Sequence, residues 1–145
     1  MIPNPSEYLI GKTYEGGLKM RITMWVMFIV GLIEVGANLI FLANMKRGKG
    51  LEAAKKFHGD FPAFASNRAW IIKIVVSLAL GAIALFAAFS IYKGYKSKVI
   101  ISGLFAGGML LLCIVQAILY GRKHMPARIS IVLGLAFVAL VFFRV

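Results

Sequence analysis

The sequence predicts an all-α integral membrane protein, a four-transmembrane-helix bundle with a short interfacial helix in its first long loop. Of its 145 residues, 61% are hydrophobic and 15% are charged, and the mean hydropathy is +0.87. Soluble domains contain roughly 45–50% apolar and about 25% charged residues. The apolar residues also fall into four long blocks, and the length suits a single membrane domain. A helical bundle in lipid therefore explains the composition better than a soluble fold does.

The first apolar block, residues 22–43, follows a polar N-terminal segment, residues 1–21. The proline and glycine residues of that segment are Pro3, Pro5, Gly11, Gly16 and Gly17. They are expected to prevent a long helix before the block. The block itself is long enough to cross a bilayer. It exceeds the roughly 7–15 apolar residues of a signal peptide and has no Ala-x-Ala cleavage site, so we interpret it as a retained first transmembrane helix.

A long basic loop, residues 44–69, separates the first two blocks. Within it, residues 51–57 (LEAAKKF) are mostly good helix formers with apolar residues on one side, which predicts a short helix lying on the membrane surface. The second block, residues 70–92, begins with Trp70 and ends with Tyr92. Aromatic residues at both ends are typical of a helix anchored at the two membrane interfaces.

Two further blocks complete the predicted bundle. Residues 99–120 follow a tight basic turn, so this span should run antiparallel to the second. They contain Gly103 and Gly107, a spacing that lets helix backbones approach closely, either inside the bundle or between protomers. Gln116 should form a hydrogen bond inside the bundle, since an unpaired amide in hydrocarbon costs several kcal/mol. Residues 126–145 just span the membrane, because a helix of this length measures about 30 Å.

The chain is strongly basic, with 17 Lys and Arg against five acidic residues and a formal charge of +12. Nearly all of these charges lie between the blocks or at their ends, where they would meet anionic lipid head groups. They are spread over four segments, which argues against nucleic-acid binding. Both termini are expected on one side of the cell membrane. Residues 44–69 and 121–128 carry nine basic residues and the terminal side seven, which favours a cytoplasmic location for those two loops.

Glu34 is the main candidate for a binding or transport site, because ionisable residues in mid-membrane usually face the bundle interior or a wet cavity. Asn38 lies one helical turn further along the same face. Lys73 lies near the loop end of the second helix, on the order of 8 Å along the axis from Glu34, and would reach it if the two helices are neighbours. The two interpretations are a hydrogen-bonded polar seam between helices and a proton-handling or transport site.

A second group, His58, Asp60 and His124, would lie on one side of the membrane and has the residue types of a metal site. No metal is favoured, because the Arg-Lys pair before His124 would repel a cation. Cys113 is the only cysteine, and it is expected to pack as a small hydrophobic residue. No nucleophile is paired with a base, so we predict no cofactor and no enzyme activity of the chain on its own. An accessory role in a membrane enzyme complex stays open.

Three short segments of the chain carry a resemblance to a known family, and they are Glu34-Val35-Gly36, Ser102-Gly103 with Gly107, and Gly121-Arg122. In these positions the chain resembles the small multidrug resistance transporters, four-span proteins with one membrane glutamate in the first helix and a small-residue third helix. The resemblance implies that Glu34 is the shared proton and cation site of an antiparallel dimer. The chain departs from that pattern in its long first connection and at Ile100 and Ile101, where the family has aromatic residues.

Two functions are compatible with the sequence. The leading hypothesis is a small non-catalytic integral-membrane subunit or scaffold of a larger complex, or a homo-oligomer. It is supported by the lack of catalytic residues and by the many small and aromatic residues available for lateral packing. The alternative is a proton-coupled or cation transporter that uses Glu34. In both cases the expected partners are membrane lipids, mainly anionic, and other membrane subunits or further copies of the chain.

Overall fold

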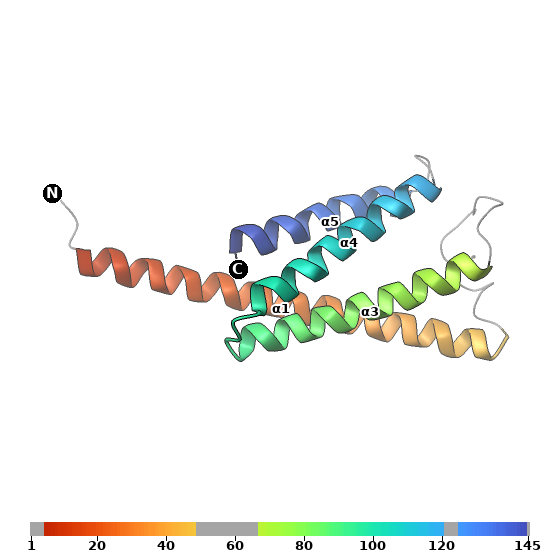
Figure 1. Ribbon diagram of the computed structural model, residues 1–145, viewed down its shortest axis with the longest axis horizontal. Coiled ribbons are helices and arrows are strands. Elements are labelled where there is room, and N and C mark those ends of the chain that lie inside the picture. The colour runs from red at the N-terminus through yellow and green to blue at the C-terminus, as the bar shows by residue number, and fades with distance from the viewer. Residues whose placement is uncertain (1–4, 49–66, 121–124, 145) are drawn as a thin grey trace.

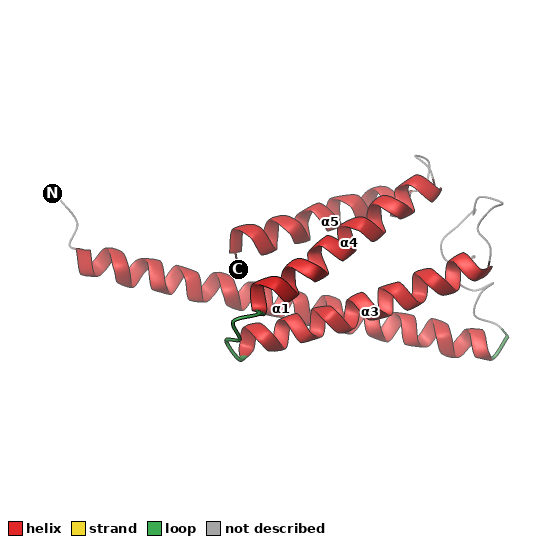
Figure 2. Cartoon of the chain, viewed as in Figure 1, coloured by secondary structure: helices red, strands yellow, loops and turns green. Residues whose placement is uncertain are grey.

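The computed structural model describes residues 5–48, 67–120 and 125–144, which form four long helices (Figure 1, Figure 2). The helices are α1 (Pro5–Lys46), α3 (Asn67–Tyr92), α4 (Lys98–Tyr120) and α5 (Met125–Arg144). No strand is present in this part of the chain. The all-α prediction and the count of four long helices are therefore confirmed for the described residues. The interfacial helix predicted at residues 51–57 lies outside them.

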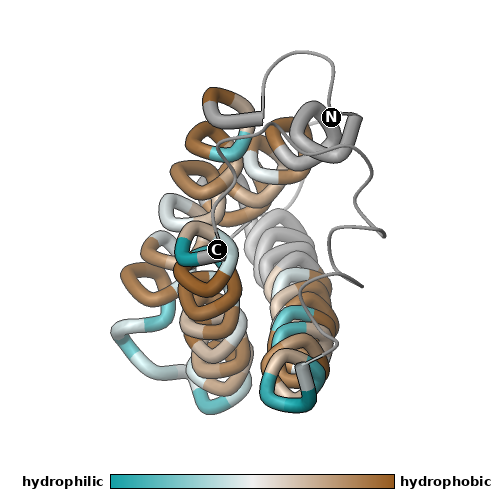
Figure 3. The backbone as a smooth tube through the Cα atoms, turned by 90° about the vertical axis from the view of Figure 1, so that its right-hand side faces the viewer, coloured by the Kyte–Doolittle hydropathy of each residue, from teal (hydrophilic) through white to brown (hydrophobic). Residues whose placement is uncertain are grey.

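Three of the described helices are long and apolar enough to cross a membrane. The apolar ranges are Met20–Lys46 in α1, Arg68–Tyr92 in α3 and Lys98–Ile118 in α4. In α5 the apolar part within the described residues is shorter, Ile131–Val141. Figure 3 shows that apolar residues form most of the coloured part of each helix, whereas hydrophilic residues gather toward the ends. The first three predicted spans, residues 22–43, 70–92 and 99–120, agree within a few residues with the apolar ranges of α1, α3 and α4.

Helix α1 is much longer than its apolar block. The expectation that prolines and glycines would prevent a long helix before residue 22 is wrong, because α1 begins at Pro5 and continues to Lys46. Proline suits the first turn of a helix, where its missing N–H is not needed. Each glycine costs only about 1 kcal/mol relative to alanine, which a helix already nucleated in the apolar block can absorb. The 42 residues span about 63 Å, and the N-terminal part extends past the other helices (Figure 1).

The connection between α3 and α4 is a tight turn built on Gly94. Its φ of 71° lies in the left-handed region that glycine adopts at little cost. The N–H of Tyr95 donates to the carbonyl oxygen of Ser90 at 2.9 Å. The N–H of Gly94 donates to the carbonyl oxygen of Ile91 at 3.1 Å, which completes a Schellman motif. The Tyr95 ring packs edge-on against Phe89, with centroids 6.0 Å apart, so the turn is held against the end of α3.

The core lies where all four helices meet. Helix α1 packs along α3 and α4 along α5, while the α3–α4 contact is smaller and the α1–α5 contact slight. Phe105 of α4 and Phe137 of α5 pack edge to face, with ring centroids 5.3 Å apart. The other buried apolar residues of this cluster are Met27, Leu80, Ala84, Ala88, Ala106, Met109 and Val141. The fold is therefore two helix pairs joined through a shared core.

Candidate functional site

Helices α1 and α3 approach each other closely at two glycines. A Cβ atom added to Gly31 would lie 2.8 Å from Leu85 Cγ and 2.9 Å from the carbonyl oxygen of Gly81. A Cβ atom added to Gly81 would lie 2.9 Å from the Cβ of Glu34 and 3.1 Å from the backbone nitrogen of Val35. Only a hydrogen atom fits at these two positions. The glycines therefore set Glu34 directly against the backbone of the neighbouring helix.

Glu34 and Asn38 form a hydrogen-bonded pair along α1. The amide Nδ2 of Asn38 donates to the carboxylate Oε2 of Glu34 at 3.1 Å and to the backbone carbonyl oxygen of Glu34 at 2.6 Å. Asn38 is only 8% exposed, whereas Glu34 is half-buried. Asn38 thus satisfies a polar group that would be costly to leave unpaired in apolar surroundings.

Lys73 belongs to the same helix interface but lies farther from Glu34 than the sequence suggested. The two helices are neighbours. Because Glu34 faces Gly81, eight residues separate that contact from Lys73, or about 12 Å along α3. The offset of about 8 Å expected from the sequence is therefore too short, and within the described residues these two side chains form no ion pair. The Lys73 ammonium group lies 4.6 Å from the ring centroid of Trp70 instead.

Ser77 is a member of this interface that the sequence analysis did not single out. It is buried and lies one helical turn from both Lys73 and Gly81, on the same helix face. The antiparallel register that sets Glu34 against Gly81 places Ser77 opposite Asn38. Lys73, Ser77 and Gly81 are spaced four residues apart and therefore share one helix face. This spacing could have identified Ser77 from the sequence. We refer to Glu34, Asn38, Ser77 and Lys73 as the polar seam.

The predicted packing role of Gly103 and Gly107 is not met inside the bundle. Among the described residues, nothing lies within 4 Å of a Cβ atom added at either position. The alternative for these two glycines, packing between protomers, stays a prediction. The close α3–α4 contact falls at Gly108 instead, where an added Cβ would lie 2.6 Å from Leu80 Cδ2. Helix α4 therefore presents a different glycine to its neighbour than its small-residue spacing indicated.

Two other sequence candidates are not joined to the polar seam. Gln116 on α4 is half-buried, and its hydrogen bond inside the bundle stays a prediction. The group of His58, Asp60 and His124 lies outside the described residues. Within the described ranges, no cluster of three or more His, Cys, Asp or Glu side chains could hold a metal ion. Cys113 is buried and packs near Gly134 of α5.

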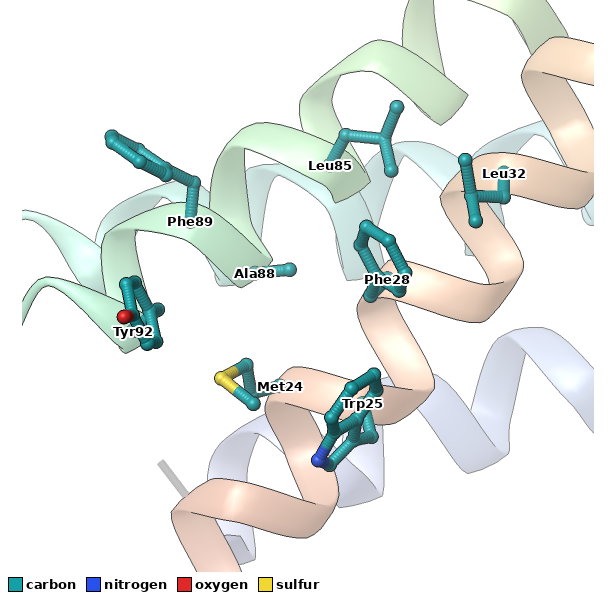
Figure 4. Close-up of a pocket in the computed structure, with 8 residues that line it drawn as sticks. All are labelled: Met24, Trp25, Phe28, Leu32, Leu85, Ala88, Phe89 and Tyr92. Atoms are coloured by element: carbon teal, nitrogen blue, oxygen red, sulfur yellow. The ribbon is translucent and has the colours of Figure 1, made fainter.

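A second feature of the α1–α3 pair is an apolar groove of about 440 Å³. Its lining residues are Met24, Trp25, Phe28 and Leu32 of α1 and Leu85, Ala88, Phe89 and Tyr92 of α3 (Figure 4). Ala88 is buried at the base of the groove, whereas the four aromatic residues are exposed. The groove lies toward the α3–α4 turn, and none of its lining residues belongs to the polar seam.

No family model, curated protein or solved structure matches the chain. Its function is therefore inferred from its own geometry. The polar seam contains a carboxyl, an amide, a hydroxyl and an ammonium group. The described contacts of these groups pair Asn38 with Glu34 and set Lys73 over an aromatic ring. Each of these contacts joins two residues of one helix, so the close approach of α1 and α3 is set by Gly31 and Gly81, and the polar groups lie along it.

Proposed function

We propose that the chain is a multi-pass protein of the cell membrane that acts as a non-catalytic subunit or scaffold of a larger membrane complex. Three apolar helices of sufficient length support this. Helix α5 would provide the fourth span, since its 20 residues reach about 30 Å. Residues 44–69 and 121–128 would then share one side of the membrane, and their slight excess of basic residues favours the cytoplasm.

The observation that carries this proposal is how little of α1 the other described helices cover. Only 17% of its apolar window is buried, against 50% in α3 and 28% in α4. Ile29, Ile33, Gly36 and Ile40 lie along one side of α1 at helical spacing, and the three isoleucines are each more than half exposed. We call these four residues the open face. Among the described residues nothing lies within 4 Å of a Cβ added to Gly36, so another helix can approach closely there.

The length of α1 also supports assembly with a partner. A helix needs about 20 residues to cross a hydrocarbon core of about 30 Å, whereas α1 has 42. If Met20–Lys46 crosses the membrane, the helix continues beyond the core for several further turns and past the other helices (Figure 1). This extension provides a helical arm for contacts outside the lipid.

Native purification tests the proposal. The full chain would be extracted from its membrane into lipid nanodiscs under mild conditions and analysed by native mass spectrometry. We expect other membrane subunits, or several further copies of the chain, in fixed proportion. A strongly denaturing detergent should release them and serves as the control. The proposal would be contradicted if native mass spectrometry always detected the protein as a monomer or dimer without other subunits.

The alternative is a proton-coupled or cation transporter that uses Glu34, and one observation favours it. The Glu34 side chain is only half-buried, so part of it stays open to a proton or cation. Its Oε2 already accepts a hydrogen bond from Asn38, however, and the apolar groove does not include it. Proton-coupled or cation uptake into proteoliposomes decides between the two. A transporter loses this uptake when Glu34→Gln is introduced, whereas a scaffold shows no uptake with either the unmodified chain or the variant.

A further inference from the structure

We propose that the apolar groove between α1 and α3 binds an acyl chain of an anionic phospholipid, whose phosphate is held by Arg21 and Lys93 at the end of the groove. This site rests on the membrane location proposed above and adds a specific ligand to it. Its support comes from the shape and lining of the groove, from the charges at one end and from the direction in which it runs.

The groove has the size and the lining of a hydrocarbon site. Its volume of about 440 Å³ falls within the roughly 300–1,000 Å³ of small-molecule pockets. Trp25 and Phe28 pack edge to face on α1, with centroids 5.9 Å apart, and Phe89 and Tyr92 stand on the α3 side (Figure 4). The lining is almost entirely apolar, so a polar ligand would leave its groups unpaired. An alkyl chain needs no hydrogen bonds and suits these walls.

Positive charge is placed directly against one end of this groove. The ammonium group of Lys93 lies 5.5 Å from the ring centroid of Tyr92 and 5.8 Å from that of Phe89, and both rings line the groove. On the other helix, the exposed Arg21 precedes Trp25 by one turn and lies on the same helix face. The two helices thus each contribute one basic residue next to a lining aromatic residue.

The start of α4 adds to this basic end. The Nζ of Lys98 lies 3.1 Å from the Sδ of Met20, so α4 begins beside the residue that precedes Arg21. No acidic residue occurs within residues 17–33 or 82–118, and these segments therefore provide no carboxylate to neutralise the charge. Basic residues near a membrane surface attract anionic lipids, which makes a phosphate the matching group.

The direction of the groove agrees with that of a phospholipid. Trp25 and Tyr92 lie at the basic end, where interfacial aromatic residues are expected. Leu32 lies seven residues further along α1, or about 10 Å deeper. A lipid with its phosphate at Arg21 would therefore extend its chain toward Leu32, along the axis of a helix that crosses the bilayer.

Quenching of tryptophan fluorescence by brominated lipids tests the site. Trp25 lines the groove, whereas Trp70, the only other tryptophan, is 2% exposed. The full chain carrying Trp70→Phe would be placed in phosphatidylcholine vesicles containing the same small share of brominated phosphatidylglycerol or brominated phosphatidylcholine. We expect stronger quenching by phosphatidylglycerol, on the order of fivefold in apparent affinity for each basic residue. If this variant fails to fold, the unmodified chain gives the same comparison over a constant Trp70 background.

A matched pair of charge variants separates a defined site from general attraction. Arg21→Gln with Lys93→Gln should abolish the preference for phosphatidylglycerol. Lys46→Gln with Arg47→Gln removes the same charge from exposed residues at the opposite end of α1 and should keep the preference.

Three results would overturn the site. Equal quenching of the unmodified chain by both lipids would remove the anionic preference, and an equal loss in both variant pairs would show only diffuse attraction. Quenching by neither lipid in an inserted chain would mean that protein, such as a second copy, covers the groove. Failure of the chain to enter the vesicles at all would contradict the membrane location itself, and sedimentation of the vesicles detects that case separately.

Discussion

The α1–α3 pair is built in two different ways along its length. At the crossing, Gly31 and Gly81 bring the two backbones into contact. Toward the α3–α4 turn, Trp25, Phe28 and Phe89 stand between the same helices and leave a groove of about 440 Å³. The crossing also carries Glu34 and Asn38, whereas the groove is lined almost entirely by apolar side chains. Side-chain size decides where the helices touch and where a ligand can enter.

The largest expected effect is at the crossing. Gly81→Leu would drive a side chain into the backbone of Val35 and the Cβ of Glu34, neither of which can move without shifting α1. We expect a loss of about 3 kcal/mol or more in the free energy of unfolding. Reversible unfolding in mixed detergent micelles would measure it.

Gly17→Leu is the matched control for that substitution. Gly17 lies on α1, and no described residue is within 4 Å of an added Cβ there. The control should cause no loss, and a gain of up to about 1 kcal/mol, because leucine is a better helix former than glycine. Equal losses at the two glycines would show that the added side chain destabilises the protein wherever it is placed, and not through the close contact of α1 with α3.

The next effect concerns the polar seam. Asn38→Leu keeps the size of the side chain but removes the amide that donates twice to Glu34. Hydrogen bonds between groups in membrane proteins contribute about 0.6 kcal/mol on average and up to about 1.7, so we expect a loss of about 1 kcal/mol. Asn44→Leu, near the C-terminal end of α1, is the control. An unchanged free energy of unfolding in the Asn38 variant would mean that the hydrogen bonds from Asn38 to Glu34 do not stabilise the fold.

A smaller effect is expected from the longer-range interaction across the seam. A double-mutant cycle with Glu34→Gln and Lys73→Met measures the coupling between the two charges. Since about 12 Å of helix axis separates Lys73 from the Gly81 contact, we expect a coupling near the lower end of the usual range, about 0.5 kcal/mol. A coupling above about 2 kcal/mol would indicate a direct ion pair.

No loss of stability is expected on α4. Gly107→Ala should raise the free energy of unfolding by up to about 1 kcal/mol, the cost of glycine relative to alanine in a helix, because this chain places nothing within 4 Å among its described residues. If Gly107 packs between protomers, the same substitution should weaken self-association measured by analytical ultracentrifugation in detergent. A clear loss of monomer stability would contradict the position of Gly107 outside the bundle.

Hydropathy was sufficient to locate the helices but not to relate them to one another. Apolar runs of about 20 residues identify membrane-length helices, and the ends near Tyr92 and Lys98 follow from the turn at Gly94. The contact of Gly81 with Glu34 depends on the register between two helices, and helices that are apolar on most sides carry little periodic signal for it. For the same reason the reach of Lys73 was overestimated, and Gly108 was not singled out. The length of α1 was missed because Pro5 suits a helix start.

The most direct test of the proposed role concerns the open face of α1. A photo-crosslinking amino acid would replace Ile33 or Ile40, which are 62% and 63% exposed, and as a control Ile72 of α3, which is 63% exposed. Irradiation of native membranes should yield a discrete protein adduct, either a second copy or another subunit, from α1 and not from Ile72. Lipid adducts alone at all three positions would show that α1 faces the bilayer and would contradict a scaffold built on this helix.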